Sequence, residues 1–300
     1  MWSQKLLENM EVAVISGKGG TGKSSITAAF ATMGGSVVLA DCDVDAANQY
    51  LIFNPTNEEE QTYIGGHKAV IDYGLCTGCG LCMSYCRFGA ISIQNGRVTI
   101  SETSCDGCFL CSRICLSKAI TMVPSDKSRM YSGLFRNGRM VYGRLAPGEE
   151  NSGKLVNMVR DKAREVASKH SIQTIVVDGP PGVGCPVIST ITGVDKVVIV
   201  TEPTVSGEHD LKRAVEIAEK FNLLPEVIIN KCDINSGVSQ HIEEWCSQRG
   251  ITVSGKLPFD KRVVEAMVNH QSVVERYPDA EISIMLREVW NNIVKQEVAK

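Results

Sequence analysis

The sequence contains no apolar run of about eighteen residues, so it predicts no membrane-spanning helix. Met1–Met10 carries charge and lacks the apolar centre of a signal peptide, and we therefore expect the protein to remain in the cytoplasm. Neither sign of charge dominates, because 31 Lys and Arg residues stand against 34 Asp and Glu residues. This balance gives no reason to expect a nucleic-acid partner or stable membrane binding. The composition is that of an ordinary globular protein, long enough for one large α/β domain or two smaller ones.

The stretch at 17–24 fits the phosphate-binding pattern G-x-x-x-x-G-K-[ST]. A buried strand expected at 12–15 and a helix expected at 25–33 flank it, which argues against a chance glycine-rich turn. The glycines let backbone N–H groups point at phosphate oxygens, Lys23 supplies a charge for the outer phosphates, and the Ser24 hydroxyl can ligate Mg²⁺. The predicted nucleotide-binding residues of this loop are Gly17, Lys18, Gly19, Gly20, Thr21, Gly22, Lys23, Ser24 and Ser25.

A second lysine, Lys18, directly follows the first glycine of this loop. The run Gly-Lys-Gly-Gly-Thr-Gly-Lys-Ser resembles the deviant Walker A loop of the MinD, ParA, Mrp and nitrogenase iron protein families. The resemblance implies that the substrate is ATP and that the protein forms a homodimer around two nucleotides. It also implies that Lys18 crosses the dimer interface to the phosphates bound by the other subunit. The alternative is that Lys18 is a solvated loop lysine.

Three aspartates, Asp41, Asp43 and Asp45, follow a buried strand expected at 36–40. The carboxyl ends of parallel strands are where ligands bind in open α/β sheets. The resemblance implies that Asp43 orients the attacking water and lies near Mg²⁺, so that Asp43 joins Lys18 and Lys23 as a catalytic residue, with Asp41 as a supporting acid. Asn48 matches an asparagine of MinD-like proteins, and we interpret Asp45 as a helix N-cap.

An apolar strand expected at 172–177 ends in Asp178, which is the pattern of a Walker B aspartate that holds Mg²⁺ through water. The predicted magnesium residues are therefore Ser24, Asp43 and Asp178. The Gly-Pro-Pro-Gly that follows resembles the switch II loop of the family. Cys185 stands at the offset of a cluster ligand in the nitrogenase iron protein, but we interpret it as a small buried cysteine, with a metal or redox role as the alternative.

The resemblance also places Asn230 and Pro258 near the adenine base. The sequence Asn-Lys-Cys-Asp at 230–233 is similar to the guanine-reading motif of GTPases as well, so guanine is an alternative base. The last expected helix, at 281–298, has one apolar face and a polar face of balanced charge. We expect this helix to pack on the sheet and not to bind a membrane.

Twelve cysteines are many for a reducing compartment, where cysteine clusters indicate metal binding more than disulfides. The pattern C-x₂-C-x₂-C-x₃-C occurs twice, which is the spacing of ferredoxins that bind two [4Fe–4S] clusters. In that arrangement the fourth cysteine of each repeat serves the other cluster. The predicted ligand sets are Cys76, Cys79, Cys82 and Cys115 for the first cluster, and Cys105, Cys108, Cys111 and Cys86 for the second. Zinc ribbons explain the C-x₂-C pairs but not the third and fourth cysteines of each run.

Two features around the repeats qualify this interpretation. Arg87 and Leu116 stand where ferredoxins carry proline after the fourth cysteine, which affects the local turn and the potentials but not the ligands. The segment 126–145 is rich in Lys and Arg and is expected to form a β-hairpin turning near Asn137 and Gly138. This basic arm is consistent with docking of an acidic redox partner, and equally with a solvated hairpin face.

The predicted fold is α/β, a doubly wound and mainly parallel P-loop sheet with an inserted α+β ferredoxin-like domain. The expected domains are 1–60 with 146–300 for the ATPase, 61–125 for the insertion and 126–145 for the arm. We expect an ATPase whose cofactors are ATP, Mg²⁺ and two [4Fe–4S] clusters, and which couples a dimer cycle to electron transfer to a redox partner. The alternatives are a metallocluster carrier of Mrp type, whose partner accepts the cluster, and a positioning ATPase of MinD type.

Overall fold

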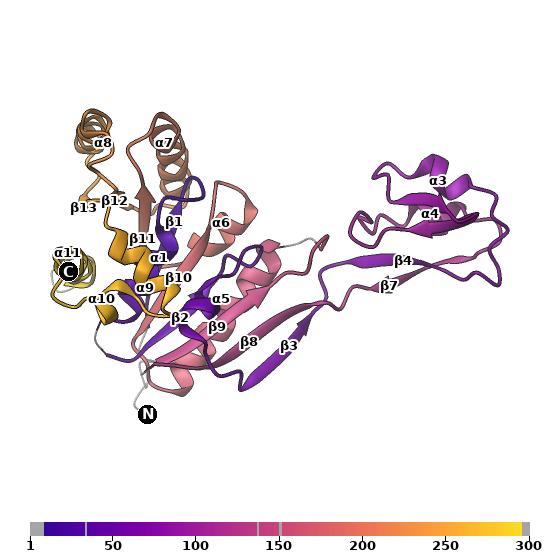
Figure 1. The fold of residues 1–300 in the computed structure, drawn as a ribbon, viewed down its shortest axis with the longest axis horizontal. Helices are drawn as coiled ribbons and strands as arrows, with labels where there is room; N and C mark the ends of the chain where they lie inside the picture. Colours follow the sequence, from indigo (N-terminus) through magenta and orange to yellow (C-terminus); the bar gives the residue numbers. More distant parts are fainter. Residues whose placement is uncertain (1–8, 34, 137, 150–151, 296–300) are drawn as a thin grey trace, which may run out of the picture.

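The computed structural model describes residues 9–33, 35–136, 138–149 and 152–295. In this described part a nine-stranded sheet forms the centre of the molecule (Figure 1). The strands, in their order across the sheet, are β13 (Val253–Leu257), β12 (Glu226–Asn230), β11 (Lys196–Thr201), β1 (Met10–Ser16), β10 (Thr174–Pro181), β2 (Val37–Asp41), β9 (Gly138–Arg144), β8 (Ser128–Phe135) and β3 (Glu59–Tyr63). Neighbouring strands from β13 to β9 pair in parallel, and β9, β8 and β3 pair antiparallel.

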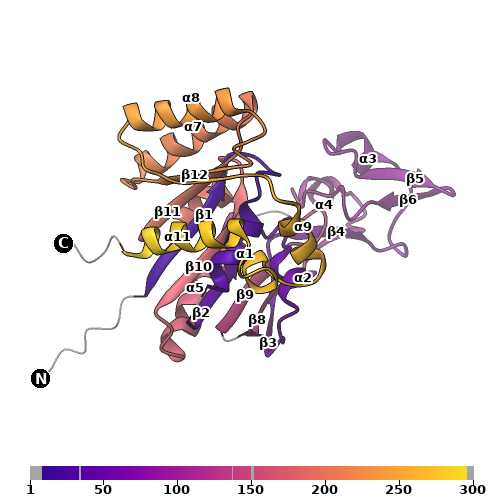
Figure 2. The same cartoon turned by 60° about the vertical axis from the view of Figure 1, so that its left-hand side comes forward.

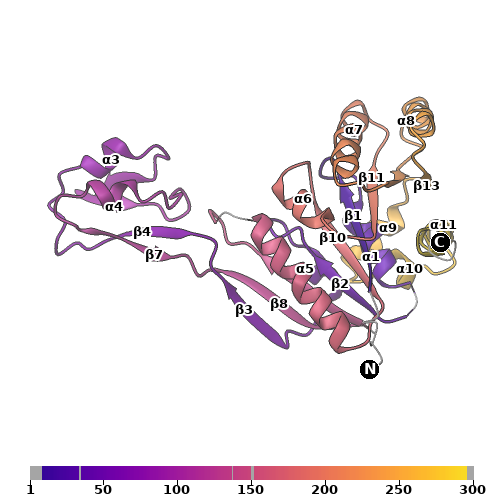
Figure 3. The same cartoon turned by 180° about the vertical axis from the view of Figure 1, so that it is seen from behind.

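Helices cover both faces of this sheet. One face carries α5 (Ser152–Lys169), α6 (Cys185–Ile191), α7 (Val205–Lys220) and α8 (Ser236–Gln248) (Figure 3). The other face carries α1 (Lys23–Ala31), α2 (Gln49–Phe53), α9 (Lys261–Val268), α10 (Val273–Arg276) and α11 (Glu281–Lys295) (Figure 2). Because helices lie on both faces, the central strands are mostly apolar, and residues 12–15 are fully buried. The predicted doubly wound, mainly parallel α/β fold is confirmed.

The last helix, α11, packs on the sheet as expected. Ile282, Leu286 and Trp290 are buried, and the rings of Trp290 and Phe30 lie 4.9 Å apart. In the described part of the chain no helix is both long enough and apolar enough to cross a membrane.

The segment 126–145 differs from the expected arm. Its two strands, β8 and β9, do form a hairpin, but β9 also pairs in parallel with β2, so the hairpin belongs to the central sheet. The physical reason is that Met140 and Val141, which are consecutive and so point to opposite faces of the strand, are both fully buried, as they would not be in an exposed arm. Most basic residues of the segment also form ion pairs within the chain, as Arg129 does with Glu60 at 3.0 Å. The other basic residues that pair with a glutamate are Lys127, Arg136 and Arg139. The expected turn residue Asn137 lies outside the described residues.

The cysteine-rich segment stands apart from the sheet (Figure 1). Since β3 ends at Tyr63 and β8 begins at Ser128, the segment between them, 64–127, is what leaves the sheet, a slightly later span than the expected 61–125. Two antiparallel strand pairs and two short helices build it: β4 (His67–Ile71) with β7 (Ile120–Pro124), β5 (Ile91–Gln94) with β6 (Arg97–Ile100), α3 (Leu81–Tyr85) and α4 (Leu110–Ile114). We call this segment the insertion.

Candidate functional site

The glycine-rich loop runs from the end of β1 to the start of α1, as the sequence predicts. Gly22, the residue before α1, has φ 91°, and a Cβ there would meet the amide nitrogen of Asn230 at 2.2 Å. A Cβ on Gly17 would meet the carbonyl oxygen of Asp210 in α7 at 2.4 Å. Gly22 therefore requires glycine because of its positive φ, and a side chain at either position would collide with its neighbour.

Lys23 is the centre of charge in the site. Its side chain is 6% exposed, and its Nζ lies 2.6 Å from Asp178 Oδ1, 3.7 Å from Asp43 Oδ2 and 3.2 Å from Ser24 Oγ. Burial disfavours the ammonium, but the carboxylates of Asp178 and Asp43 outweigh it, so the pKa of Lys23 is raised. The structure thus brings the three predicted magnesium residues together around the lysine that is predicted to bind phosphate.

Asp41 organises the loop that carries Asp43. Its carboxylate accepts hydrogen bonds from the backbone N–H groups of Asp43 at 3.2 Å, Asn48 at 3.1 Å and Gln49 at 3.0 Å. Burial, followed by the nearby charge of Asp178, raises the pKa of Asp41 to about 8. Asp41 therefore acts on the site through the backbone of this loop.

Gln49 is a site residue that the sequence analysis missed. It is fully buried, and its Nε2 donates to Asp178 Oδ2 at 2.7 Å and to the Ser24 carbonyl at 2.8 Å. Its backbone starts α2 directly after Asn48, which has the N-cap position but makes no side-chain cap bond. No signal in the neighbouring sequence reveals it, because its burial follows from the packing of α2.

Three buried acceptor atoms around this site have no hydrogen-bond partner among the described residues. They are Thr21 Oγ1, Asn48 Oδ1 and Gln49 Oε1. Unsatisfied buried oxygens cost free energy, and they suit a ligand that brings its own donors, such as metal-bound water. Mg²⁺ needs few protein ligands because it keeps waters and shares the phosphates of its nucleotide. The donor set of this site therefore fits a magnesium nucleotide.

Lys18 is neither solvated nor directed away from its own subunit. Its Nζ lies 2.7 Å from Glu202 Oε1 and donates to Thr204 Oγ1 at 3.1 Å and Ser206 Oγ at 3.0 Å. Glu202 also pairs with Lys231 at 2.9 Å, and Lys231 donates to the Gly20 carbonyl. The Glu202 carboxylate, which was not predicted as a site residue, thus joins two lysines at the phosphate-binding loop.

A cavity of about 200 Å³ lies beside the loop, and both residues predicted to contact the base line it. Asn230 donates to the Thr21 carbonyl at 2.8 Å, which ties the end of β12 to the loop. Pro258 and Phe259 form part of the apolar wall. Asp233, the acid of the guanine-like motif, already accepts a hydrogen bond from the Phe259 N–H at 2.7 Å.

Two sequence interpretations are wrong in this region. Cys185 is exposed, not buried, because it is the first residue of α6 directly after the loop at 182–184. Asp45 is not a helix N-cap, because α2 begins only at Gln49. Asp45 instead accepts a hydrogen bond from Ser152 at the start of α5, which opposes the rise in its pKa that burial causes.

The two cysteine repeats have the same local structure. The third cysteine of each run is the second residue of a five-residue helix, α3 or α4, and the fourth is the C-cap residue with ψ 107°. Gly78 and Gly107, which precede the second cysteines, have φ 71° and 69°. A Cβ on Gly107 would also meet the His67 carbonyl oxygen at 2.3 Å, so this loop packs closely on β4.

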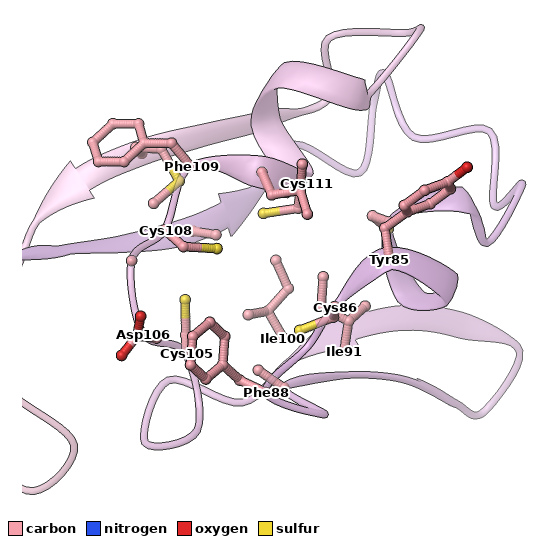
Figure 4. Close-up of a pocket in the computed structure, with 16 residues that line it drawn as sticks. Tyr85, Cys86, Phe88, Ile91, Ile100, Cys105, Asp106, Cys108, Phe109 and Cys111 are labelled. Atoms are coloured by element: carbon pink, nitrogen blue, oxygen red, sulfur yellow. The ribbon is translucent and has the colours of Figure 1, made fainter.

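The predicted second ligand set converges in the structure. Cys86, Cys105, Cys108 and Cys111 line one pocket, and their sulfur atoms point into the same space (Figure 4). Aliphatic and aromatic side chains, among them Phe88 and Ile100, complete the wall. All twelve cysteines are free thiols. Three cysteines of one repeat and the fourth of the other thus line one pocket, which Cys82 of the other predicted set also lines.

Members of the first set are also neighbours. Burial raises the pKa of the Cys82 thiol, and the nearby thiols of Cys115 and Cys76 act in the same direction. Among the described residues no three His, Cys, Asp or Glu side chains lie close enough to hold a single metal ion. Thiolates are the ligands that iron–sulfur clusters require. The free thiols, their number and their convergence fit such a cluster.

Comparison with known proteins identifies a family over most of the chain. Residues 12–273 match the model of the CobQ/CobB/MinD/ParA nucleotide binding domain. An uncharacterized protein of Methanocaldococcus jannaschii, MJ0578, is 34% identical over 272 residues, which cover 78% of this chain and 94% of the relative. The septum site-determining protein MinD of Bacillus subtilis is 22% identical over 70% of this chain and 82% of its own length.

Solved structures share the fold at lower identity. The septum site-determining protein MinD of Pyrococcus horikoshii, complexed with Mg-ADP, superposes with a TM-score of 0.57 at 16% identity, and the match covers 96% of each chain. At this identity the likeness concerns the fold alone.

Proposed function

Because the chain belongs to the CobQ/CobB/MinD/ParA nucleotide-binding family and is a P-loop ATPase of MinD/ParA type, we propose that it couples ATP hydrolysis to electron transfer. In this proposal two [4Fe–4S] clusters in the insertion carry the electrons. The observation that carries it is the convergence of Cys86, Cys105, Cys108 and Cys111 on one pocket of a segment attached to a nucleotide-binding body.

The proposed roles in the nucleotide site follow from its contacts. The loop N–H groups and Lys23 bind the phosphates, and Lys23 must leave Asp178 and Asp43 to do so. Ser24, Asp43 and Asp178 hold Mg²⁺, directly or through water, and Asp43 orients the water for in-line attack. Stabilising the charge that develops on the phosphates supplies most of the acceleration.

A homodimer completes the proposed site. On dimerisation Lys18 would leave Glu202 and reach the nucleotide of the partner subunit. The ion pair between Lys18 and Glu202 at 2.7 Å would therefore form only while the subunits are apart. Asn230, Pro258 and the apolar wall of their cavity would hold adenine. Dimer closure would then move the loops that connect the nucleotide to the insertion.

The cluster residues are proposed in two sets. Cys105, Cys108, Cys111 and Cys86 would hold one cluster, and Cys76, Cys79, Cys82 and Cys115 the other. Such clusters accept and release single electrons at potentials set by charge, hydrogen bonds and exposure. The protein's part is to supply thiolates, to shield them with residues such as Phe88, and to fix nearby charges.

The second candidate is a metallocluster carrier of Mrp type. What favours electron transfer is that the pocket is walled by apolar side chains and that all four thiols of one proposed ligand set line it. A carrier would hold its cargo at an incomplete, exposed site, from which it can leave. A positioning ATPase of MinD type would need no converging thiols.

The test is anaerobic and has two stages. Iron and acid-labile sulfide are measured in the wild type, in Cys105→Ser and in Cys185→Ser, an exposed cysteine outside the repeats that serves as the control. We expect Cys105→Ser to lose one cluster's iron and Cys185→Ser to retain both clusters. The rate of electron transfer from the reduced protein to an acceptor is then measured with and without MgATP.

Each outcome of the second stage assigns a function. Transfer that accelerates with MgATP while iron is retained supports the proposal. Movement of iron and sulfide to an apo-acceptor on addition of ATP would replace it with the carrier function. If the first stage finds no iron in the wild type, both the electron-transfer and the carrier functions are refuted.

A further inference from the structure

Lys68, the second residue of β4, lies where the insertion meets the nucleotide-binding body. Its side chain is buried, with the residue only 7% exposed, and its Nζ donates to two backbone carbonyls. One is the carbonyl of Cys105 in the second ligand set, at 2.7 Å. The other is the carbonyl of Gly148, in the loop between β9 and α5. A single ammonium group therefore joins a cluster-ligand residue to the body.

Among the residues that the structure describes, Lys68 forms no ion pair. The two groups that accept hydrogen bonds from its Nζ are the neutral carbonyls of Cys105 and Gly148. Two acids, Asp106 and Glu149, line the same cavity as Lys68, and the Glu149 carboxylate accepts hydrogen bonds from Ser125 at 2.7 Å and from Ser128. A buried cation that forms no direct ion pair is costly, and a counter-charge close to it lowers that cost. A cluster held by four thiolates is anionic, and it would supply that counter-charge.

The loop that holds Lys68 is tied in turn to the nucleotide site. Leu145 N–H donates to the Val44 carbonyl at 2.9 Å, and Val44 is the residue after Asp43. Ser152, at the other end of the loop, bonds to the side chain of Asp45. Gly148 packs closely on the insertion and requires glycine, because it has φ 75° and a Cβ would meet the Thr103 carbonyl oxygen at 2.4 Å.

From this geometry we infer that Lys68 is a positioning residue that sets the potential of the cluster held by the Cys105 set and transmits the nucleotide state to it. The inference rests on the proposed function. A shift of the Asp43 loop moves the loop at 145–149, and the Gly148 carbonyl carries the ammonium toward or away from Cys105. Because a nearby cation stabilises the more negative, reduced cluster, its position sets how easily the cluster accepts an electron.

The experiment is a redox titration followed by electron paramagnetic resonance, on the full-length protein with and without MgATP. Lys68→Met removes the charge and the hydrogen bonds, and Lys68→Gln removes the charge but keeps an amide donor. Lys127→Met is the matched control, because Lys127 is exposed and paired with Glu102. Iron and sulfide are measured in each sample, so that the presence of clusters is decided separately from their potentials.

We expect both Lys68 variants to lower the reduced-to-oxidised ratio of one cluster about tenfold at a fixed potential, equivalent to about 59 mV for one electron. The other cluster and Lys127→Met should not change. In the wild type MgATP should shift the same cluster, and in the variants this shift should be lost.

Unchanged potentials with iron retained would overturn the inference and leave the proposed function standing. A wild type without iron would overturn the proposed function, and the inference with it. If both uncharged variants lose the cluster, Lys68→Arg decides: retention of the cluster by this charged variant supports the counter-charge, and its loss shows that Lys68 only packs.

Discussion

Replacing Gln49 by leucine tests the nucleotide site most directly, because it removes one amide group and little volume. Gln49 Nε2 makes two hydrogen bonds, to Asp178 Oδ2 at 2.7 Å and to the Ser24 carbonyl at 2.8 Å. A bond to a charged acceptor contributes about 1.5–3 kcal/mol and one to a carbonyl about 0.5–1.5 kcal/mol. The substitution also removes the unpaired Gln49 Oε1, which returns about 1–3 kcal/mol.

We therefore expect the free energy of unfolding without ligand to fall by only about 1 kcal/mol. The larger effect of the substitution should appear in ligand binding. In the wild type the bound ligand would give Gln49 Oε1 a hydrogen-bond donor, and Gln49 Nε2 would hold Asp178 in place for Mg²⁺. Loss of one such bond weakens Mg²⁺ binding about tenfold, or about 1.4 kcal/mol.

The assay is calorimetric titration of Mg²⁺ into ADP-saturated protein, with ADP titrated in EDTA as the reference. Gln240→Leu is the matched control, because this exposed glutamine in α8 donates to Glu244 at 2.9 Å, far from the site. Its effect on stability should stay within about 0.5 kcal/mol. Two results would refute the idea that Gln49 positions Asp178 for Mg²⁺. One is an equal loss of ADP affinity in Gln49→Leu with and without Mg²⁺, and the other is an unchanged affinity for Mg²⁺.

Three further changes test other parts of the structure. Gly22→Ala places a Cβ at φ 91°, only 2.2 Å from the side-chain amide of Asn230. We expect the affinity for nucleotide to fall at least tenfold in a fluorescent-ADP titration. Unchanged affinity would contradict the packing described for this loop. Glu202→Gln releases the lysine of the phosphate-binding loop, so ATP-induced dimerisation, measured by sedimentation, should strengthen several-fold, and weaker association would argue that the glutamate assists the dimer. Arg160→Met leaves Glu11 buried with one fewer partner and should lower the free energy of unfolding in urea by about 3 kcal/mol, whereas Arg249→Met, at an exposed ion pair, should cost below about 1 kcal/mol; equal costs would refute the role of burial.

The nucleotide loop was predictable because its features are local in sequence. Residues 17–24 carry their own conformational demands, and the strand and helix that flank them have clear apolar patterns. The acids Asp41, Asp43 and Asp178 were equally visible, since Asp41 ends the buried strand β2, Asp43 follows it, and Asp178 follows the apolar run 175–177 of β10. Parallel pairing then brings strand ends to one edge, so these acids meet without any further information.

Contacts made through space were not predictable in this way. Glu202 and Gln49 lie far from their partners in sequence, and nothing in their own neighbourhoods marks a glutamate or glutamine as a site residue. Lys68 is one lysine among many until the fold buries it between two carbonyls. Cys185 was expected to be buried but is exposed for a related reason. It follows a short loop, whose sequence has no apolar pattern that shows which side chains face solvent.

The pairing of β9 with β2 explains why the insertion can sense the nucleotide at all. In this parallel pair Asp41 lies beside Tyr142, so both strands end at the same edge of the sheet. The loop after β2 carries Asp43, and the loop after β9 carries Gly148, and they become neighbours because the strands run in the same direction. An antiparallel β9 would have delivered its following loop to the opposite edge, away from the phosphates. An isolated basic arm would therefore have left the cysteines without a connection, whereas a strand of the central sheet gives them one through Leu145, Gly148 and Lys68.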